Sequence, residues 1–497
     1  MALKQNIIAN YLGQGWAALM GLAFIPFYIA TLGVEAWGLI GFMAMLQAWF
    51  LLLDMGLTPA LSREMARFLG GEHSAQSIRD LLRSLEIVYV SIATVISVVV
   101  WLGSDWISSH WLTANQLPEA TVRQAVAVMG LVVAARMTEQ VYRGAIQGLQ
   151  RQVWLNKCLA IFSTLRWAGV IPVLWWIDTS LLAFFLWQGL VSIVSVLVLA
   201  RYAYLALPPL DRSARFSMRS LQAIKGFAGG MASTTLLALI LTQVDKLLLS
   251  KLVSLDEFGY YAIGTSVAAA LGFLVAPAAS AVLPRMTECL TRHDQEAVTA
   301  IYHSASQWLA AVLIPASLVM AVFAQPLIFA WMGDAEVATR TAPLLTLLAL
   351  GTMFNGFMQI PYTAQLAHGW TSMAVRINLV AVCLIVPGIL WSVPRHGVTA
   401  AAWAWLLLNV GYVLISVHFM HRKIMRAEKW IWYRDAVFRP LLVAGIFVVL
   451  VHQFFQLPDD RLGIFFALTT IGTLTSVLVI GSLPLSRQFF SRRFRLP

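Results

Sequence analysis

The sequence consists largely of long apolar runs, and their length limits the folds that it can adopt. A helix that crosses the hydrocarbon core of a membrane needs about 20 mostly apolar residues. Gly, Pro and charged residues divide the chain into such runs near 10–32, 37–57, 86–102, 122–146, 158–177, 181–200, 226–250, 258–282, 306–331, 342–366, 375–392, 398–419, 440–456 and 463–482. Because lipid offers no partners for backbone N–H and C=O groups, runs of this length are expected to be helices. We therefore predict an all-α membrane protein with about 14 transmembrane helices.

The composition agrees with this prediction and excludes several other classes. Hydrophobic residues make up 60% of the 497 residues and charged residues 11%, whereas a soluble domain has about 25% charged residues. The three cysteines, Cys158, Cys289 and Cys383, lie far apart and show no metal-binding spacing. We therefore expect free thiols, no metal and no cofactor.

The distribution of Lys and Arg predicts the orientation in the membrane. With the N-terminus placed in the cytoplasm, twenty-five of the 34 basic residues fall in inside segments. Only Lys251, Arg340, Arg395 and Arg461 fall in outside loops. Since basic residues accumulate on the cytoplasmic side, we predict a multi-pass protein with cytoplasmic N- and C-termini. The net charge of +11 then faces anionic lipid, and no nucleic-acid partner is expected.

A weak internal repeat predicts the domain organisation. Trp37-Gly38 and Phe258-Gly259 each follow an acidic residue in a short outside loop, and each is followed by a span that ends inside near an arginine, Arg63 or Arg285. Six predicted spans separate the copies, so both copies have the same orientation, as in transporters with parallel repeats. We predict a six-helix lobe at 1–210, a second six-helix lobe at 211–425, and two extra helices with a basic tail at 426–497.

Motifs for catalysis and nucleotide binding are absent from the sequence. It contains no GxxxxGK[ST], HExxH, GxSxG or SxxK pattern. The predicted outside loops are short, and a membrane glycosyltransferase or polymerase would be expected to carry its catalytic groups on a larger one. We therefore predict that the protein is not an enzyme.

Charged residues inside the predicted spans are the main candidates for a functional site, because charge is costly in lipid. Arg136 and Glu139 are spaced i, i+3, and Glu139 and Arg143 are spaced i, i+4, so the three share one helix face. This face is interpreted either as a cationic surface for an anionic head group or as an Arg–Glu–Arg ladder that joins helices. Guanidinium suits phosphate because its planar fork binds two oxygens. Arg166, in the next span, is expected either to join this surface or to extend toward the inner interface.

Other polar side chains in the predicted spans are candidates for ion coupling or for lining a cavity. Asp245 is interpreted as an ion or proton site, or as a salt-bridge partner of Lys246 or of an arginine in the other lobe. Asp54 is a further coupling candidate, although a capping role at the following chain break is favoured. Asn6, Asn10, Gln14 and Tyr28 lie at roughly helical spacing and either line a cavity or form an amphipathic entrance. Glu139 is the third candidate for ion coupling.

Three segments resemble the polysaccharide (O-antigen) flippases of the multidrug/oligosaccharidyl-lipid/polysaccharide (MOP) exporter superfamily. They are NYLGQGWAALMGLAFIPFYIATLGVEAWGLIGF (10–42), LDMGLTPALSREMAR (53–67) and QVDKLLLSKLVSLDEFGYYAIG (243–264). The resemblance extends over nearly the whole chain. It implies two six-helix lobes plus two C-terminal helices, a cationic cavity that opens alternately to each side, and coupling to an ion gradient. Arg136, Arg143 and Arg166 are the candidates for the cationic surface, placed by helix-face reasoning.

The resemblance also implies a substrate and a location. The substrate would be an undecaprenyl-pyrophosphate-linked oligosaccharide, moved from the cytoplasmic to the periplasmic leaflet of the bacterial inner membrane for O-antigen or exopolysaccharide synthesis. A polysaccharide polymerase and chain-length machinery are the expected protein partners. The alternatives are a lipid II type flippase, a cation-coupled multidrug exporter of the same superfamily, and, with less support, an O-antigen polymerase.

Overall fold

The computed structural model describes residues 2–54, 56–209, 212–370 and 372–484. Within these residues the regular structure is helical, apart from one isolated bridge between Thr113 and Ser254. Twelve helices or helix pairs are long and apolar enough to cross a membrane. A thirteenth span is counted if α11 (Leu255–Ala269) and α12 (Gly272–Thr291), which meet at a bend of 42°, form one span. The predicted all-α membrane class is confirmed, and the number of 14 spans stays a prediction.

The contacts divide the chain into two compact units, Met1–Gly259 and Tyr260–Pro497. The division lies inside α11, because α10 (Met218–Leu252) packs on three helices of the first unit: α3 (Val34–Phe50), α4 (Leu57–Leu69) and α5 (Ala75–Trp106). Helix α10 covers the segment 226–250, which the sequence predicts as a span. The predicted lobes at 1–210 and 211–425, with extra helices at 426–497, stay predictions.

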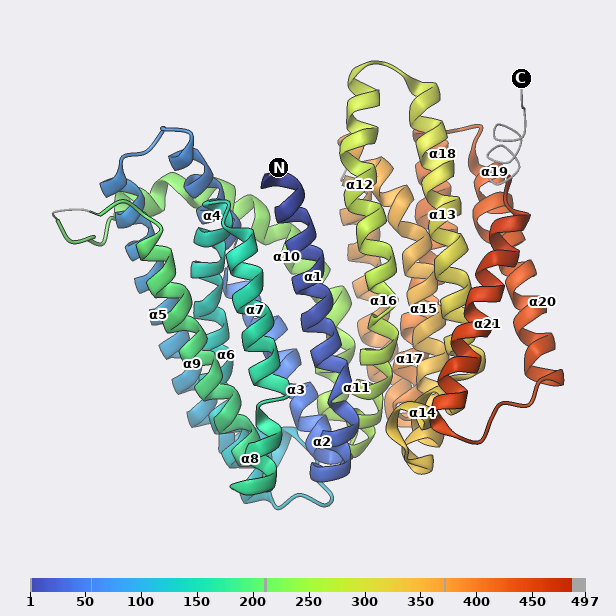
Figure 1. The fold of residues 1–497 in the computed structure, drawn as a ribbon, viewed down its shortest axis with the longest axis horizontal. Helices are drawn as coiled ribbons and strands as arrows, with labels where there is room; N and C mark the ends of the chain where they lie inside the picture. The colour runs from blue at the N-terminus through green and yellow to red at the C-terminus, as the bar shows by residue number, and fades with distance from the viewer. Residues whose placement is uncertain (1, 55, 210–211, 371, 485–497) are drawn as a thin grey trace. The chain divides into compact units, whose positions relative to one another are not determined.

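The first unit is a bundle in which α6 packs on both α5 and α9, and α1 lies alongside α7 (Figure 1). Besides α10, its α-helices are α1 (Ala2–Ala23), α2 (Ile25–Leu32), α3 (Val34–Phe50), α4 (Leu57–Leu69), α5 (Ala75–Trp106), α6 (Glu119–Gly148), α7 (Gln152–Trp167), α8 (Val170–Trp176) and α9 (Leu181–Leu205). Pro118 and the acidic Glu119 favour the start of α6, since proline needs no N–H partner there and an acid complements the helix dipole. Ser74 caps α5 by accepting a bond of 3.1 Å from the Ser77 N–H.

The starts of α3 and α11 pack against each other at the two copies of the sequence repeat. A Cβ on Gly38 would lie within 3.0 Å of the Leu255 carbonyl oxygen, and a Cβ on Gly259 would lie equally close to the Val34 carbonyl. Both glycines are therefore required by the close approach of the two backbones. Since residue 38 corresponds to 259 and residue 34 to 255 in the repeat, the contact is reciprocal, as expected about a local two-fold axis.

The buried Glu35 carboxylate binds the loop that leads into α6 and holds it next to this contact. Glu35 is 3% exposed and accepts backbone N–H bonds from Asn115, Gln116 and Leu117, the last two at 2.8 Å. The Asn115 side-chain amide donates to Asp256 at 3.1 Å. A single loop thereby joins the start of α3 to the start of α11.

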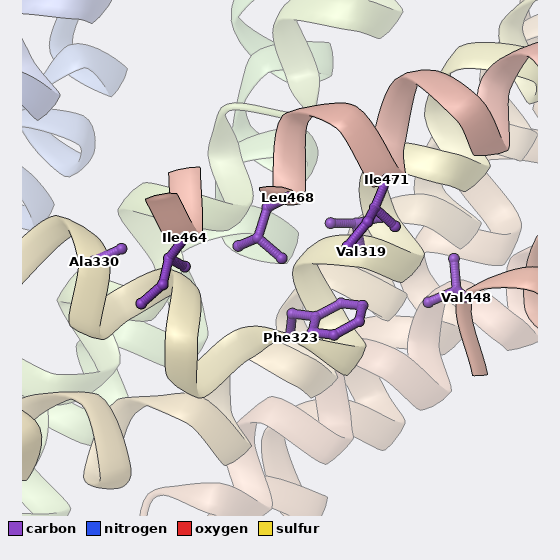
Figure 2. Close-up of a cluster of buried hydrophobic side chains, with 7 residues drawn as sticks. All are labelled: Val319, Phe323, Ala330, Val448, Ile464, Leu468 and Ile471. Atoms are coloured by element: carbon purple, nitrogen blue, oxygen red, sulfur yellow. The ribbon is translucent and has the colours of Figure 1, made fainter. Parts of the chain in front are cut away.

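The second unit contains α11 from Tyr260 onward and the helices that follow it in the chain. These are α12, α13 (Gln295–Val322), α14 (Ala324–Met332), α15 (Ala335–Ala367), α16 (Ser372–His396), α17 (Thr399–Gly411), α18 (Val417–Lys423), α19 (Lys429–Trp432), α20 (Arg439–Phe454) and α21 (Arg461–Ser482). Figure 2 shows the apolar cluster by which the last two helices pack on α13 and α14. It consists of Val319, Phe323, Ala330, Val448, Ile464, Leu468 and Ile471. Arg461 strengthens this packing by donating to the Ala330 and Trp331 carbonyls at 2.9 and 2.7 Å, at the end of α14.

Candidate anion-binding cavity

Two arginines meet one buried glutamate where α6 packs on α7. Glu139 of α6 is 1% exposed, and Arg166 of α7 donates to its carboxylate at 2.6 Å. The Arg143 Nε lies 3.5 Å from the other carboxylate oxygen. Arg136, Glu139 and Arg143 all lie on α6, as the sequence predicted, and Arg166 joins them from the next helix.

Arg136 is held by neutral amide groups instead of an acid. Its two terminal nitrogens donate to Gln47 Oε1 of α3 at 2.8 Å and to Gln188 Oε1 of α9 at 2.7 Å. The Gln188 amide in turn donates to the Arg166 carbonyl at 2.9 Å. These bonds fix the direction of the guanidinium without neutralising its charge.

A cavity of about 230 Å³ lies in front of these arginines. Its lining comes from single faces of three helices of the first unit: Gly13, Gln14 and Ala17 of α1, Arg136 and Arg143 of α6, and Asn156, Leu159, Ser163, Arg166 and Trp167 of α7. Asn156, Leu159, Ser163 and Arg166 are spaced i, i+3, i+7 and i+10, which is one face of a helix. An Asn156–Asn10 side-chain bond of 2.6 Å joins α7 to α1 beside the cavity. The volume far exceeds the roughly 15 Å³ that one water molecule requires.

The charges of this site do not balance. Glu139 offers one negative charge to Arg136, Arg143 and Arg166, so two positive charges remain when all four groups are ionised. The Nε groups of Arg136 and Arg166 are buried and have no hydrogen-bond partner among the described residues. Buried donors of this kind need an acceptor, since an unmade bond costs about 1–3 kcal/mol. The excess positive charge of Arg136, Arg143 and Arg166, which line the cavity, suits an anion such as phosphate. In the described part of the chain, no group of three His, Cys, Asp or Glu side chains could hold a metal ion.

The other two coupling candidates have different surroundings. Asp245 lies on α10, and the Lys246 Nζ is 3.5 Å from its carboxylate, which is the salt-bridge arrangement considered for it. Asp54 ends the 3₁₀ turn Leu51–Asp54 and accepts bonds from the Thr58 backbone N–H at 3.2 Å and the Thr58 hydroxyl at 2.6 Å. The Tyr89 hydroxyl also donates to Asp54. Asp54 therefore satisfies an otherwise unpaired N–H in the first turn of α4.

The capping contacts of Asp54 lead to a prediction. Asp54→Ala should lower the free energy of unfolding by about 1–2 kcal/mol, whereas Asp54→Asn should lower it by less because the amide oxygen still accepts. The check is a denaturant titration of both purified variants in mixed micelles, followed by a transport assay. An Asp54→Asn variant that keeps its stability but loses transport would assign the charge to ion coupling instead.

Sequence reasoning missed several residues of this site. Gln47 and Gln188 were not singled out, because single amides in apolar spans carry no pattern until the arginine they contact is known. Asn156 and Ser163 were also missed. They are spaced i, i+7, and Arg166 follows Ser163 by three residues, so the three polar residues could have been recognised as one helix face. Of the polar residues expected near the first span, Gln14 lines the cavity and Asn10 bonds to Asn156, whereas Tyr28 is buried and the side chain of Asn6 lies outside the described residues.

The described helices form a membrane-spanning fold with a charged cavity inside one bundle, and the family models and relatives together support a transporter of the MOP superfamily. Residues 3–290 match the family model described as polysaccharide biosynthesis protein, and residues 231–391 match the MatE model. Because the first match covers more than half of the chain, the chain belongs to the polysaccharide biosynthesis protein family, the polysaccharide flippases of this superfamily. The resemblance seen in the sequence is confirmed.

Individual relatives agree with this assignment. A Shigella flexneri protein described as a candidate O-antigen transporter is 18% identical over 405 residues, which cover 82% of this chain and 94% of that protein. The lipid II flippase MurJ in an inward closed conformation is similar in fold, with a TM-score of 0.75, 13% identity and coverage of 99% of both chains. An inward-facing multidrug resistance MATE family transporter gives a TM-score of 0.68 at 13% identity, covering 83% of this chain and 96% of that one.

Proposed function

We propose that this protein flips an undecaprenyl-pyrophosphate-linked oligosaccharide from the cytoplasmic to the periplasmic leaflet, for O-antigen or exopolysaccharide synthesis. The observation that carries the proposal is the cavity where Arg136, Arg143 and Arg166 exceed the single acid Glu139. A pyrophosphate brings at least two negative charges and acceptors suited to guanidinium forks. The Shigella relative and the family model support a polysaccharide precursor as the cargo.

The proposal includes a location and an order of events. The protein lies in the bacterial inner membrane with both termini in the cytoplasm, as the basic loops predict. The pyrophosphate binds the arginine face while the prenyl chain stays in lipid, and alternating access carries the head group across. Glu139, Asp245 or Asp54 couples this cycle to an ion gradient. A polysaccharide polymerase and chain-length machinery then use the product.

Two alternatives within the superfamily differ in the cargo. A cation-coupled drug exporter would need acids to dominate its cavity, and the only acid in contact with these arginines, among the described residues, is Glu139, which Arg143 and Arg166 already engage. A lipid II flippase would use the same pyrophosphate chemistry, so the arginines alone do not separate it from an O-antigen flippase. The identity of the accumulated lipid intermediate does separate them. An O-antigen polymerase is disfavoured by the transporter relatives.

The test is a deletion strain complemented with variants, scored for surface polysaccharide and for the sidedness of lipid-linked intermediates. The Arg136→Ala, Arg143→Ala double variant should abolish the polymer and trap intermediates on the cytoplasmic leaflet, at an unchanged protein level. The matched control is Arg123→Ala, an exposed arginine on the same helix whose partner Asp105 lies 3.5 Å away. Normal polymer in the double variant would refute the role of the arginine face. Trapped lipid II would indicate the lipid II alternative.

A further inference from the structure

A second basic cavity lies in the second unit, where α18 leads into α19. Its volume is about 420 Å³, and His421, Arg422, Arg426 and Lys429 line it. His421 is 1% exposed, and its two ring nitrogens contact the Val417 carbonyl and the Tyr302 hydroxyl, so it forms a fixed wall. The other three side chains supply positive charge, and the lining contains no acid.

The cations of this cavity are positioned without being neutralised. The Arg426 Nε donates to the Arg422 backbone carbonyl at 2.9 Å, which leaves its terminal nitrogens free to bind elsewhere. Lys429 donates to His418 Nδ1 at 2.7 Å, and since that nitrogen accepts, His418 adds no charge of its own. No described residue accepts a bond from the Arg422 side chain.

The nearest acid in the sequence is already engaged by another residue. Glu428 contacts His303 Nε2 of α13 at 2.7 Å, so its carboxylate is directed to that partner. Three positive charges thus surround one cavity without a carboxylate in its lining. The dipole of α18 would favour basic residues near its C-terminal end, but it does not require them to converge on a cavity of this size.

Aromatic rings lie against two basic residues of this segment, one of which, Lys429, lines the cavity. The Lys423 Nζ lies 4.1 Å from the centre of the Trp370 ring, and the Lys429 Nζ lies 4.6 Å from that of Trp430. Trp430 is 71% exposed. Exposed tryptophans beside basic residues are typical of the membrane interface, and a pocket for a free anion would not need this apolar border.

We propose that this cavity binds the phosphate-bearing head group of an anionic phospholipid. The Arg422 and Arg426 guanidiniums take the phosphate oxygens, Lys429 adds a third charge, and the acyl chains lie along the exposed apolar side chains next to it. Basic pockets on the cytoplasmic side of membrane proteins bind anionic lipids in this way. The site is separate from the arginine cavity of the first unit, and it does not depend on which substrate is transported.

The test measures lipid retention by the full-length purified protein with native mass spectrometry. Phosphatidylglycerol, phosphatidylcholine and inorganic phosphate are each titrated into the detergent-solubilised protein. We expect retention of phosphatidylglycerol over phosphatidylcholine, reduced about tenfold or more in Arg422→Gln, Arg426→Gln. The matched control is Arg201→Gln, Arg219→Gln, which removes two exposed arginines of the first unit that are also predicted to face the cytoplasm.

The outcomes separate lipid binding from general charge. Equal loss in the control variant, or equal retention of both lipids by the wild type, would overturn the proposal. Phosphate that binds with the same dependence on Arg422 and Arg426, without lipid retention, would also overturn it in favour of an ion site. If the double variant does not fold, the wild-type protein still provides a test. Phosphatidylglycerol should raise the melting temperature of the wild-type protein and phosphatidylcholine should not.

Discussion

Replacing Glu139 with alanine is expected to lower the free energy of unfolding by about 3–5 kcal/mol, the cost of removing one partner from a buried ion pair. Glu139 is 1% exposed and receives Arg166 at 2.6 Å and Arg143 at 3.5 Å. Without it, the three cations of the cavity would repel one another with no acid in contact. The measurement is a denaturant titration in mixed micelles, with the melting temperature as a second readout.

Two further variants test whether the lost stability comes from the buried ion pair. Glu139→Gln keeps an oxygen for Arg166 and should lose less stability than Glu139→Ala, because a neutral hydrogen bond replaces a charged one. Adding Arg166→Ala to Glu139→Ala should recover part of the loss, since the unpaired cation is then removed as well. Glu119→Ala, at the exposed start of the same helix, is the control and should change stability by less than about 1 kcal/mol. Equal losses at Glu119 and Glu139 would contradict the ion-pair explanation.

The same variants bear on the two interpretations of the arginine face. If Arg136 and Arg143 only joined helices, their substitution would reduce stability and transport together. Arg136 donates to the neutral amides of Gln47 and Gln188. A neutral donor at position 136 could therefore replace these bonds with weaker ones. A variant of Arg136 or Arg143 that folds but does not transport would therefore identify an anion-binding role, as the proposed function requires.

The parts of the site that lie on one helix could be predicted from the sequence. Arg136, Glu139 and Arg143 share a face because the period of an α-helix fixes it, whatever the helix packs against. Twelve predicted spans coincide with helices long and apolar enough to cross a membrane, because an apolar run of about 20 residues marks each one, although α5 begins at Ala75, well before the run at 86–102. An amphipathic first half does not register as an apolar run, but it continues the helix.

Contacts between helices could not be predicted from one sequence. Whether Arg166 meets Glu139 or extends to the interface depends on the rotation of α7 against α6, which hydropathy does not determine. The Gln47 and Gln188 contacts of Arg136 depend likewise on the placement of α3 and α9. Asp54 was correctly associated with a cap because its partner, Thr58, lies only four residues away.

The reciprocal contact between α3 and α11 gives the other prediction with a large expected effect. Gly38→Ala and Gly259→Ala should each lower the free energy of unfolding by about 1–3 kcal/mol, because the new methyl group meets a backbone oxygen that cannot rotate away. The matched control is Gly445→Ala in α20, where nothing lies within 4 Å of the added carbon. The control should be neutral or stabilising by up to about 1 kcal/mol, as for an unconstrained helical glycine.

The symmetry of this contact makes the double variant the decisive measurement. Either substitution alone must separate the start of α3 from the start of α11, and this separation also relieves the overlap at the other glycine. The double variant Gly38→Ala, Gly259→Ala should therefore cost less than the sum of the single variants, by about 0.5–3 kcal/mol. Strictly additive costs would mean that the two contacts yield independently, and would remove the argument for a local two-fold relation between the repeats. A sub-additive result would link a pattern seen in the sequence, Trp37-Gly38 and Phe258-Gly259, to one shared packing constraint.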